Sequence, residues 1–205
     1  VTDTTALALQ ALTISGNLTV TAAGITDSGA LVVPGTTTLA AGAGNDITLN
    51  TAGNNFSTVV ISSGNDVTLV DTNAIALGAS TVSGDLSVTA GGAVTQSGAL
   101  AVTGTTTVSA AGNNVTLNNA ANDFTGAVGI TGANVALVDV NAIDLAASTV
   151  SGTCSVTADG AITDSGALAI TGAATFAAGA GNDITLDTAG NNFSTVVISS
   201  GNDVT

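Results

Sequence analysis

The ionisable side chains of this chain are almost all aspartates. Its 205 residues include 14 acidic residues, every one an Asp, and a single Cys, but no Lys, Arg or His, so the formal net charge is -14. Carboxylates alone can bind hard cations and can accept hydrogen bonds from the backbone at turns. They cannot supply a general base near neutral pH, a Schiff-base amine or a Ser-His relay. We therefore expect no enzymatic activity.

The clearest candidate site is the segment AGAGNDITL, which covers residues 41–49 and returns at 178–186. It is similar to the glycine-rich calcium nonapeptide, in which Asp side chains and backbone oxygens of stacked turns hold the ion. Asp46 and Asp183 are the candidate calcium ligands, and calcium is the only cofactor that the sequence suggests. No second nonapeptide follows in tandem, however, and Asn114 replaces the Asp in the middle of the chain. The sequence therefore favours an Asp that caps a turn, with no metal or cofactor.

The other recurrent aspartates also fit turns. Asp3, Asp71 and Asp139 recur at an equal spacing, and they are the stronger candidates if any carboxylate is required. Asp66 has Asn134 as its counterpart, which suits a turn because an Asx side chain bonds the backbone with or without a charge. In both sets we expect a structural role rather than a ligand role.

One pair of carboxylates could serve polysaccharide hydrolysis, which some β-helical enzymes catalyse. Asp27 and Asp164 are the nearest pair related by the repeat, but Gln96 stands between them in the series. Such sites need carboxylates clustered on one face together with a basic group or a metal. The sequence supplies no basic group, so we expect no catalytic residues.

The strongest feature of the sequence is an internal repeat with a period of about 68 residues. The matching segments SGNLTVTAAG, SGDLSVTAGG and SGTCSVTADG contain Gly16, Gly84 and Gly152. Repeats of this length predict one solenoid rather than separate domains, and we expect an excerpt from a longer array. The expected units are residues 1–68, 69–136 and 137–205.

Short β-branched runs separated by Gly, Asn, Asp or Ser predict strands and almost no helix. No Asn-Gly pair is present to form two-residue hairpins, so the strands should stack as coils. We predict an all-β, right-handed parallel β-helix with about three coils of roughly 22 or 23 residues per unit, or nine coils in all. Four shorter coils per unit remain an alternative.

Stacked coils also predict which side chains point inward and which stand in columns. Asn54, Asn55 and Asn65 should form amide ladders with Asn residues of neighbouring coils. Cys154 occupies the position of a Leu in the other units, so we expect a small buried apolar residue. The predicted inward positions are Leu18, Val20, Leu86, Val88, Cys154 and Val156.

Charge and hydropathy exclude several partners. Without Lys or Arg the chain cannot neutralise phosphates, so we expect no binding to nucleic acid. The apolar runs are all shorter than a membrane-spanning helix requires, so this segment should not insert into a membrane.

The pattern xLxVTAGGxIxxSGxLxVxG, followed by AGxGNDITL, resembles the large repetitive surface proteins of bacteria. The resemblance is to filamentous-haemagglutinin and autotransporter-like adhesins, and it covers the whole chain as a style of repeat. It implies an exported, extracellular β-helical fibre at the cell surface that holds adhesive regions away from the cell.

We therefore expect a rigid stalk or filament segment of an acidic surface fibre or adhesin, without catalysis. Its partners would be further repeats of the same chain or identical subunits placed end to end, and glycans of a host or neighbouring cell. The alternative is a cation- or glycan-binding β-solenoid module whose repeats calcium stabilises.

Overall fold

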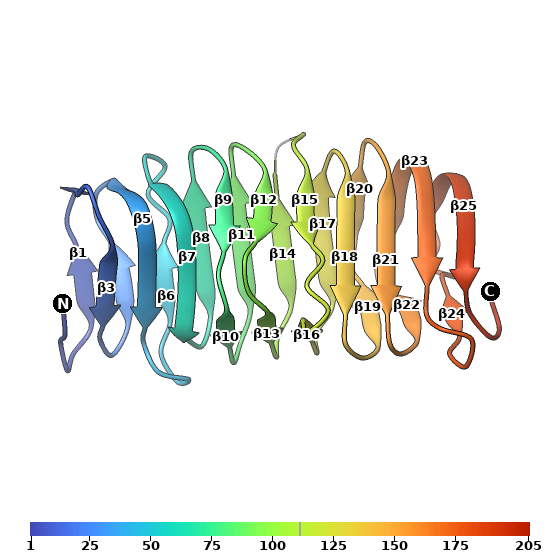
Figure 1. Cartoon of the computed structure of the whole chain (residues 1–205), viewed down its shortest axis with the longest axis horizontal. Coiled ribbons are helices and arrows are strands. Elements are labelled where there is room, and N and C mark those ends of the chain that lie inside the picture. Colours follow the sequence, from blue (N-terminus) through green and yellow to red (C-terminus); the bar gives the residue numbers. More distant parts are fainter. Residues whose placement is uncertain (111) are drawn as a thin grey trace.

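The computed structural model describes residues 1–110 and 112–205, and within these ranges all regular secondary structure is β-strand. The strands follow one another along a rod whose termini lie at opposite ends (Figure 1). No described helix is long and apolar enough to cross a membrane. The strands are β1 Leu7–Leu9, β2 Leu12–Thr13, β3 Leu18–Thr21, β4 Ile25–Asp27, β5 Leu31–Ala40, β6 Ile47–Leu49, β7 Asn55–Ser63, β8 Val67–Asp71, β9 Ile75–Leu77, β10 Ser80–Val82, β11 Leu86–Ala90, β12 Val94–Gln96, β13 Leu100–Val102, β14 Thr106–Ser109, β15 Val115–Leu117, β16 Asp123–Phe124, β17 Val128–Gly132, β18 Val135–Asp139, β19 Ile143–Leu145, β20 Ser148–Val150, β21 Cys154–Ala158, β22 Ile162–Asp164, β23 Leu168–Ala177, β24 Ile184–Thr185 and β25 Asn192–Ser200.

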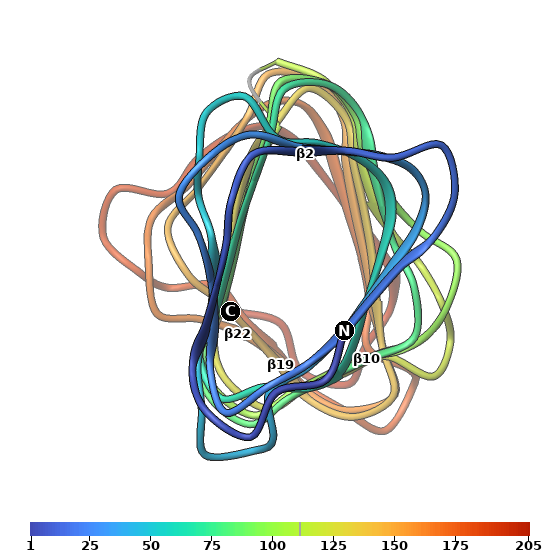
Figure 2. The same cartoon turned by 90° about the vertical axis from the view of Figure 1, so that its left-hand side faces the viewer.

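All of the strand pairings are parallel and join one coil to the next, as a β-helix requires. Viewed from the N-terminal end, the chain runs clockwise as it recedes, so the solenoid is right-handed (Figure 2). The predicted all-β, right-handed parallel β-helix is therefore confirmed.

Two long faces run along the rod, each a continuous stack of parallel strands, and shorter stacks complete the coils between them. The strand β5 turns a corner at Pro34 and Gly35, where its register shifts, and β7, β23 and β25 span two faces in the same way. The first face contains β1, β4, β6, β8, β11, β14, β17, β20 and the leading parts of β23 and β25. The second contains β3, the trailing parts of β5 and β7, β9, β12, β15, β18, β21 and the trailing parts of β23 and β25. The short stacks are β2 with the leading parts of β5 and β7, then β10 with β13 and β16, and then β19 with β22 and β24.

The coils are shorter than the sequence predicted and vary in length along the rod. On the first face, Leu7 pairs with Ile25 near the start, and Ala169 pairs with the more distant Asn192 near the end. The average coil is short because many corners are turned by only a few residues. The chain therefore makes about ten turns rather than nine, or about 43 Å from the first coil to the last at 4.8 Å per step.

The prediction of about three coils per unit is confirmed. A unit does not contain a whole number of coils, however, and this affects where equivalent residues of successive units lie. Seven successive strand pairings lead from Leu18 in β3 to Val156 in β21, two residues beyond Cys154, the equivalent of Leu18 two units later. A unit thus spans about three and a half coils, and equivalent residues of successive units alternate between the two long faces. Leu18 and Cys154 lie on the second face and Leu86 on the first.

The interior is a continuous column of aliphatic side chains. All six predicted inward positions are buried, which confirms that part of the prediction. Phe56, Phe124 and Phe176 are the largest fully buried side chains. Burial of this kind is the main favourable term in folding, and here every coil contributes to it.

Glycine is required at the corners because the preceding coil approaches closely. A Cβ atom on Gly84 would overlap Oδ1 of Asp66, and one on Gly152 would overlap Oδ1 of Asn134. Gly16 occupies the equivalent position in the first unit, where a Cβ atom would meet nothing within 4 Å.

We predict that Gly84→Ala lowers the free energy of unfolding by about 1–3 kcal/mol, the usual cost of overpacking, while Gly16→Ala changes it little. Urea denaturation of both variants measures this difference. The double variant Gly84→Ala with Asp66→Ala should recover part of the loss, because the overlapping carboxylate is gone. Equal stability of Gly84→Ala and the parent would contradict the steric explanation.

Candidate functional site

The predicted calcium ligands lie at exposed corners and bond to the following coil. Oδ1 of Asp46 accepts hydrogen bonds from Nδ2 of Asn65 at 2.9 Å and from the backbone N–H of Asp66 at 3.2 Å. Oδ1 of Asp183 accepts the equivalent bonds from Asn202 at 2.9 Å and Asp203 at 3.1 Å. These bonds lower the pKa of both carboxyl groups, the side-chain amide having the larger effect. Each carboxylate therefore acts as a cap for the next corner.

The same contact repeats from coil to coil, and we call this column of Asp and Asn side chains the Asx ladder. Oδ1 of Asp66 accepts the N–H of Asp85 at 2.9 Å, and Oδ1 of Asp85 accepts the N–H of Thr105 at 2.7 Å. In the middle unit Oδ1 of Asn134 accepts the N–H of Thr153 at 2.9 Å. An amide oxygen replaces a carboxylate there, which indicates that the corner needs an acceptor rather than a charge. In the described ranges no three acidic, His or Cys side chains gather as metal ligands would.

Asp71 and Asp139 are buried instead of exposed. Oδ2 of Asp71 accepts the N–H of Phe56 at 2.5 Å, while its Oδ1 accepts the N–H of Asn73 at 2.8 Å. Asp139 makes the same two bonds, to the N–H groups of Phe124 and Asn141, both at 2.8 Å. Burial outweighs these bonds and raises the pKa of both carboxyl groups.

Asp3 is the counterpart of these two residues in the first coil. Its Oδ1 accepts the backbone N–H and the hydroxyl of Thr5, both at 2.8 Å. Because its carboxylate is exposed, these bonds lower the pKa of Asp3. The three equivalent aspartates thus share a turn and differ in whether a preceding coil covers them.

The carboxylates that a hydrolase could have used do not converge. Asp27 ends β4 and Asp164 ends β22, seven strand pairings further along the rod, which is about 34 Å at 4.8 Å per step. Gln96 ends β12, on the other long face. Oδ2 of Asp27 accepts a 2.6 Å bond from Nδ2 of Asn54. Each of the three side chains holds a loop of the following coil.

These loops are organised by a buried Asn that the sequence suggested for a different role. Oδ1 of Asn54 accepts the N–H of Leu31 at 2.8 Å, and Asn122 and Asn191 do the same in the other units. The predicted amide ladder is confirmed in part. Nδ2 of Asn73 donates a hydrogen bond to Oδ1 of Asn55 at 3.0 Å, but Asn54 bonds the carboxylate of Asp27 rather than another Asn. Recurrence two residues before Phe56, Phe124 and Phe193 was the only signal in the sequence for this role.

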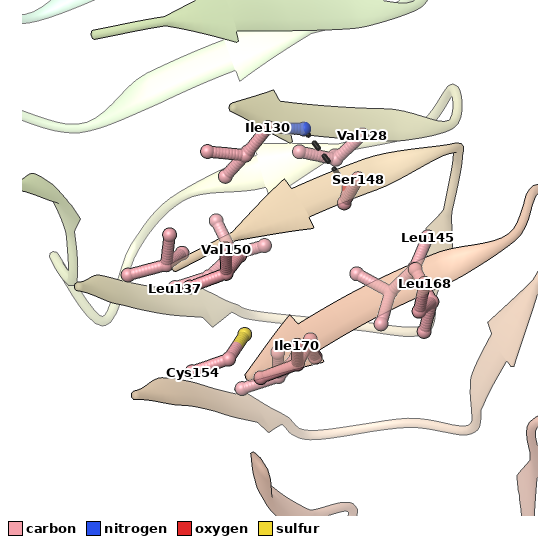
Figure 3. A pocket seen from close by; sticks show the side chains of 11 residues that line it. Val128, Ile130, Leu137, Leu145, Ser148, Val150, Cys154, Leu168 and Ile170 are labelled. Carbon is pink, nitrogen blue, oxygen red and sulfur yellow. Dashed lines mark hydrogen bonds between the residues drawn. The ribbon is translucent and has the colours of Figure 1, made fainter. Parts of the chain in front are cut away.

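A cavity of about 20 Å³ lies inside the solenoid, lined by Cys154 together with aliphatic side chains such as Ile130, Val150 and Ile170 (Figure 3). It is too small to hold a substrate. This is room for about one water molecule, and the lining is too apolar to hold one. Burial raises the pKa of the Cys154 thiol to about 12, so it stays a neutral, small core residue as predicted.

The profile of a family described as repeats of unknown function (DUF5649) matches the chain three times, over residues 1–63, 64–131 and 132–200. The chain belongs to this family. These repeats have the period of the expected units, with the second and third starting five residues earlier, at 64 and 132 rather than 69 and 137. No curated protein and no solved structure matches the chain significantly. Membership of the repeat family and the solenoid fold together describe a repetitive β-helical protein.

We predict that acidification from pH 7 towards about pH 4 raises the melting temperature. The pKa values of Asp71 and Asp139 are raised by folding, so the folded chain binds protons more readily than the unfolded chain, and the stability gained is complete below 3.8. A tenfold difference in proton affinity contributes about 1.4 kcal/mol. Destabilisation by acid should begin only below 3.8, where Asp46 and Asp183, whose pKa values are lowered, become protonated.

The double variant Asp71→Asn, Asp139→Asn should flatten this rise. Asp66→Asn with Asp203→Asn removes the same number of charges from exposed corners, where the middle unit already has Asn134, and it should retain the rise. NMR titration of the side-chain carboxyl carbons measures the two pKa values directly in the parent chain. Values at or below 3.8 would contradict the prediction.

We also predict that calcium has no specific effect on stability. The melting temperature in millimolar calcium should equal that in magnesium and should not fall in EDTA, because Asp46 and Asp183 already bond the next coil. The variant Asp46→Asn, Asp183→Asn reproduces the Asn114 of the middle unit and should be about as stable as the parent. A calcium-specific rise that this variant abolishes would assign the site to calcium.

Proposed function

We propose that this chain is a rigid structural segment of an extracellular, repetitive surface fibre or adhesin, and that it has no catalytic role. The observation that carries the proposal is the continuous pairing of parallel strands along two faces, around a core of apolar side chains, through about ten turns. A rod of this kind resists bending because every coil is bonded to the next along both of these faces.

The distribution of polar side chains supports the same role. The carboxylates that could have performed chemistry are engaged in bonds from one coil to the next, at Asp27, Asp46, Asp71 and their equivalents. No group of opposite charge exists among the side chains to assist them. Side-by-side rods repel one another through a charge of -14 each, which favours separate fibres unless salt screens them.

An extracellular location is supported by the resemblance of the repeats to filamentous-haemagglutinin and autotransporter-like adhesins. In such a protein the segment would act as a spacer, joined to further repeats of the same chain, and would hold adhesive regions at a distance from the cell. Surface glycans would be partners of those regions.

Immunogold electron microscopy of the cells that produce this protein tests the proposal. We expect gold particles on intact cells, arranged along thin unbranched filaments, with an advance of about 17 Å per unit, which is about three and a half coils at 4.8 Å. The matched control is the same antibody on permeabilised cells. Gold particles that appear only after permeabilisation would overturn the extracellular role.

A further inference from the structure

Two asparagines lie in a motif that neither the coil-to-coil bonding nor the proposed function uses. The motif is Asn-X-Ser/Thr, in which X is any residue except Pro, and it is the acceptor signal for N-linked sugars. It occurs at Asn17, Asn55, Asn114 and Asn192. We consider Asn55 and Asn114, because coils lie on both sides of them. The chain is rich in Asn and Thr, so the motif needs support from the structure.

Both motifs place the Asn on the outward side of the coil, next to a buried anchor. Side chains alternate along a strand, so residues two apart lie on the same side. Asn55 is half-buried and Ser57 is exposed, while Phe56 between them is buried in the core. Asn114 is exposed, and the buried Val115 anchors the second motif in the same way. The two side chains that define each motif therefore face outward together.

The amide oxygen of each Asn bonds to the next coil. Oδ1 of Asn55 accepts a hydrogen bond from Nδ2 of Asn73 at 3.0 Å. Oδ1 of Asn114 accepts a bond from the backbone N–H of Asn134 at 3.2 Å and another from its Nδ2 at 3.0 Å. These bonds hold both side chains in place and use only their oxygen atoms.

Equivalent residues of other units show that these positions need only an acceptor. Asp123 replaces Asn55 in the middle unit, and its Oδ1 accepts the same bond from Nδ2 of Asn141 at 2.9 Å. Asp46 replaces Asn114 in unit one and accepts the equivalent bonds. An ionised carboxylate can only accept hydrogen bonds, so the fold makes no use of an amide N–H at either position.

The amide nitrogens are correspondingly free. Nδ2 of Asn55 and Nδ2 of Asn114 have no hydrogen-bond partner among the described residues, and the former is open to solvent. Most Asn residues outside the motif donate through Nδ2. Nδ2 of Asn54, for example, donates to Asp27 at 2.6 Å, and Nδ2 of Asn134 donates to Asn114 at 3.0 Å. The nitrogen that would carry a sugar is therefore available at the two motifs.

Space for a sugar lies beside the first motif. A surface groove of about 560 Å³ is lined by Pro34, Asn55, Phe56, Ser57, Asn73 and Ala74. Sites for small molecules have volumes of about 300–1,000 Å³. A sugar joined to Nδ2 of Asn55 therefore has room next to the strand β7.

We propose that Asn55 and Asn114 are attachment sites for an N-linked sugar, joined through Nδ2 on the folded rod. The donor is a sugar activated by pyrophosphate at its anomeric carbon and carried by a nucleotide or a lipid. In the transfer, the bond from that carbon to the pyrophosphate oxygen breaks, and the pyrophosphate leaves with the electron pair. Nδ2 forms the new bond to the carbon and releases one of its two protons to a base of the transferring enzyme. Oδ1 remains an acceptor in the product, so the bonds to the next coil are kept.

Mass spectrometry of the protein from the cells that produce it tests the proposal. Digestion needs a protease that cleaves before Asp, because the chain has no Lys or Arg for trypsin, and it gives peptides 46–65 and 85–122. Fragmentation by electron transfer should locate sugar on Asn55 and Asn114 and none on Asn54. A single sugar, or chains of graded length, would indicate a nucleotide-linked donor, and one complete oligosaccharide would indicate a lipid-linked donor.

Variants of the first motif test the role of its hydroxyl residue. Ser57→Ala leaves Asn55 in place but removes the motif, so the sugar on Asn55 should be lost. Ser57→Thr keeps the motif and should keep the sugar. The matched control is Ser62→Ala, which changes an exposed Ser of the same strand outside any motif. Circular dichroism checks that all three variants retain the β-structure of the parent.

Two variants that create a motif test whether a free Nδ2 is required. Asp123→Asn copies Asn55, so its new amide nitrogen should be free and should gain a sugar. Ala136→Thr introduces the residue that unit one has at the equivalent position and completes a motif at Asn134. Nδ2 of Asn134 already bonds Asn114. The occupancy should therefore be about tenfold lower than in the first variant, since that hydrogen bond must break.

Three results would overturn the proposal. These are the absence of sugar from Asn55 or Asn114, sugar that persists on Asn55 in Ser57→Ala, and equal occupancy in the two variants that create a motif. None of them bears on the location of the fibre, which the gold labelling measures. Conversely, a protein that carries both sugars but is found only inside cells would refute the proposed function and retain the two attachment sites.

Discussion

The whole structure depends on parallel pairing between successive coils. A parallel ladder requires each strand to meet a strand in the same direction one coil later, and the coils meet this condition along two faces at once. Inward aliphatic side chains follow from it, because a narrow tube can hold only small and medium apolar groups and an occasional Phe. The corners must then be compact, and glycine with Asx residues allows the backbone of one coil to lie close to the next.

The Asx ladder and the buried aspartates solve one problem in two ways. At a corner the ladder of parallel strands is interrupted, and backbone N–H groups would remain without acceptors. At exposed corners an Asp or Asn such as Asp66 or Asn134 accepts the next N–H, and water screens the charge. At Asp71 the acceptor is enclosed, and the cost of burying the carboxylate is a raised pKa. Local acceptor geometry, rather than catalysis or metal binding, explains where these carboxylates lie.

Much of the fold could be predicted from the sequence. Alternation identified Leu18, Leu86 and Cys154 as inward residues, and the absence of Asn-Gly turns favoured coils over hairpins. The relation between unit and coil could not be predicted, because spacing in a sequence does not determine how many residues a corner consumes. The prediction that Asn54 would stack on Asn residues of neighbouring coils was wrong for the same reason. Asn54 lies over Asp27 and not over another Asn, since the repeat does not contain a whole number of coils.

Because a unit does not contain a whole number of coils, a change in the number of units also changes the orientation of the coils that follow. Arrays of near-identical repeats gain and lose units by recombination, and units one and three here end in almost the same segment, 40–68 and 177–205. Insertion of a single unit would lengthen the rod and also turn everything beyond it by about half a revolution, because a unit spans about three and a half coils. A gain of two units would nearly restore the original direction. Variation in repeat number would therefore change both the length of the rod and the direction in which its distal end faces around the axis.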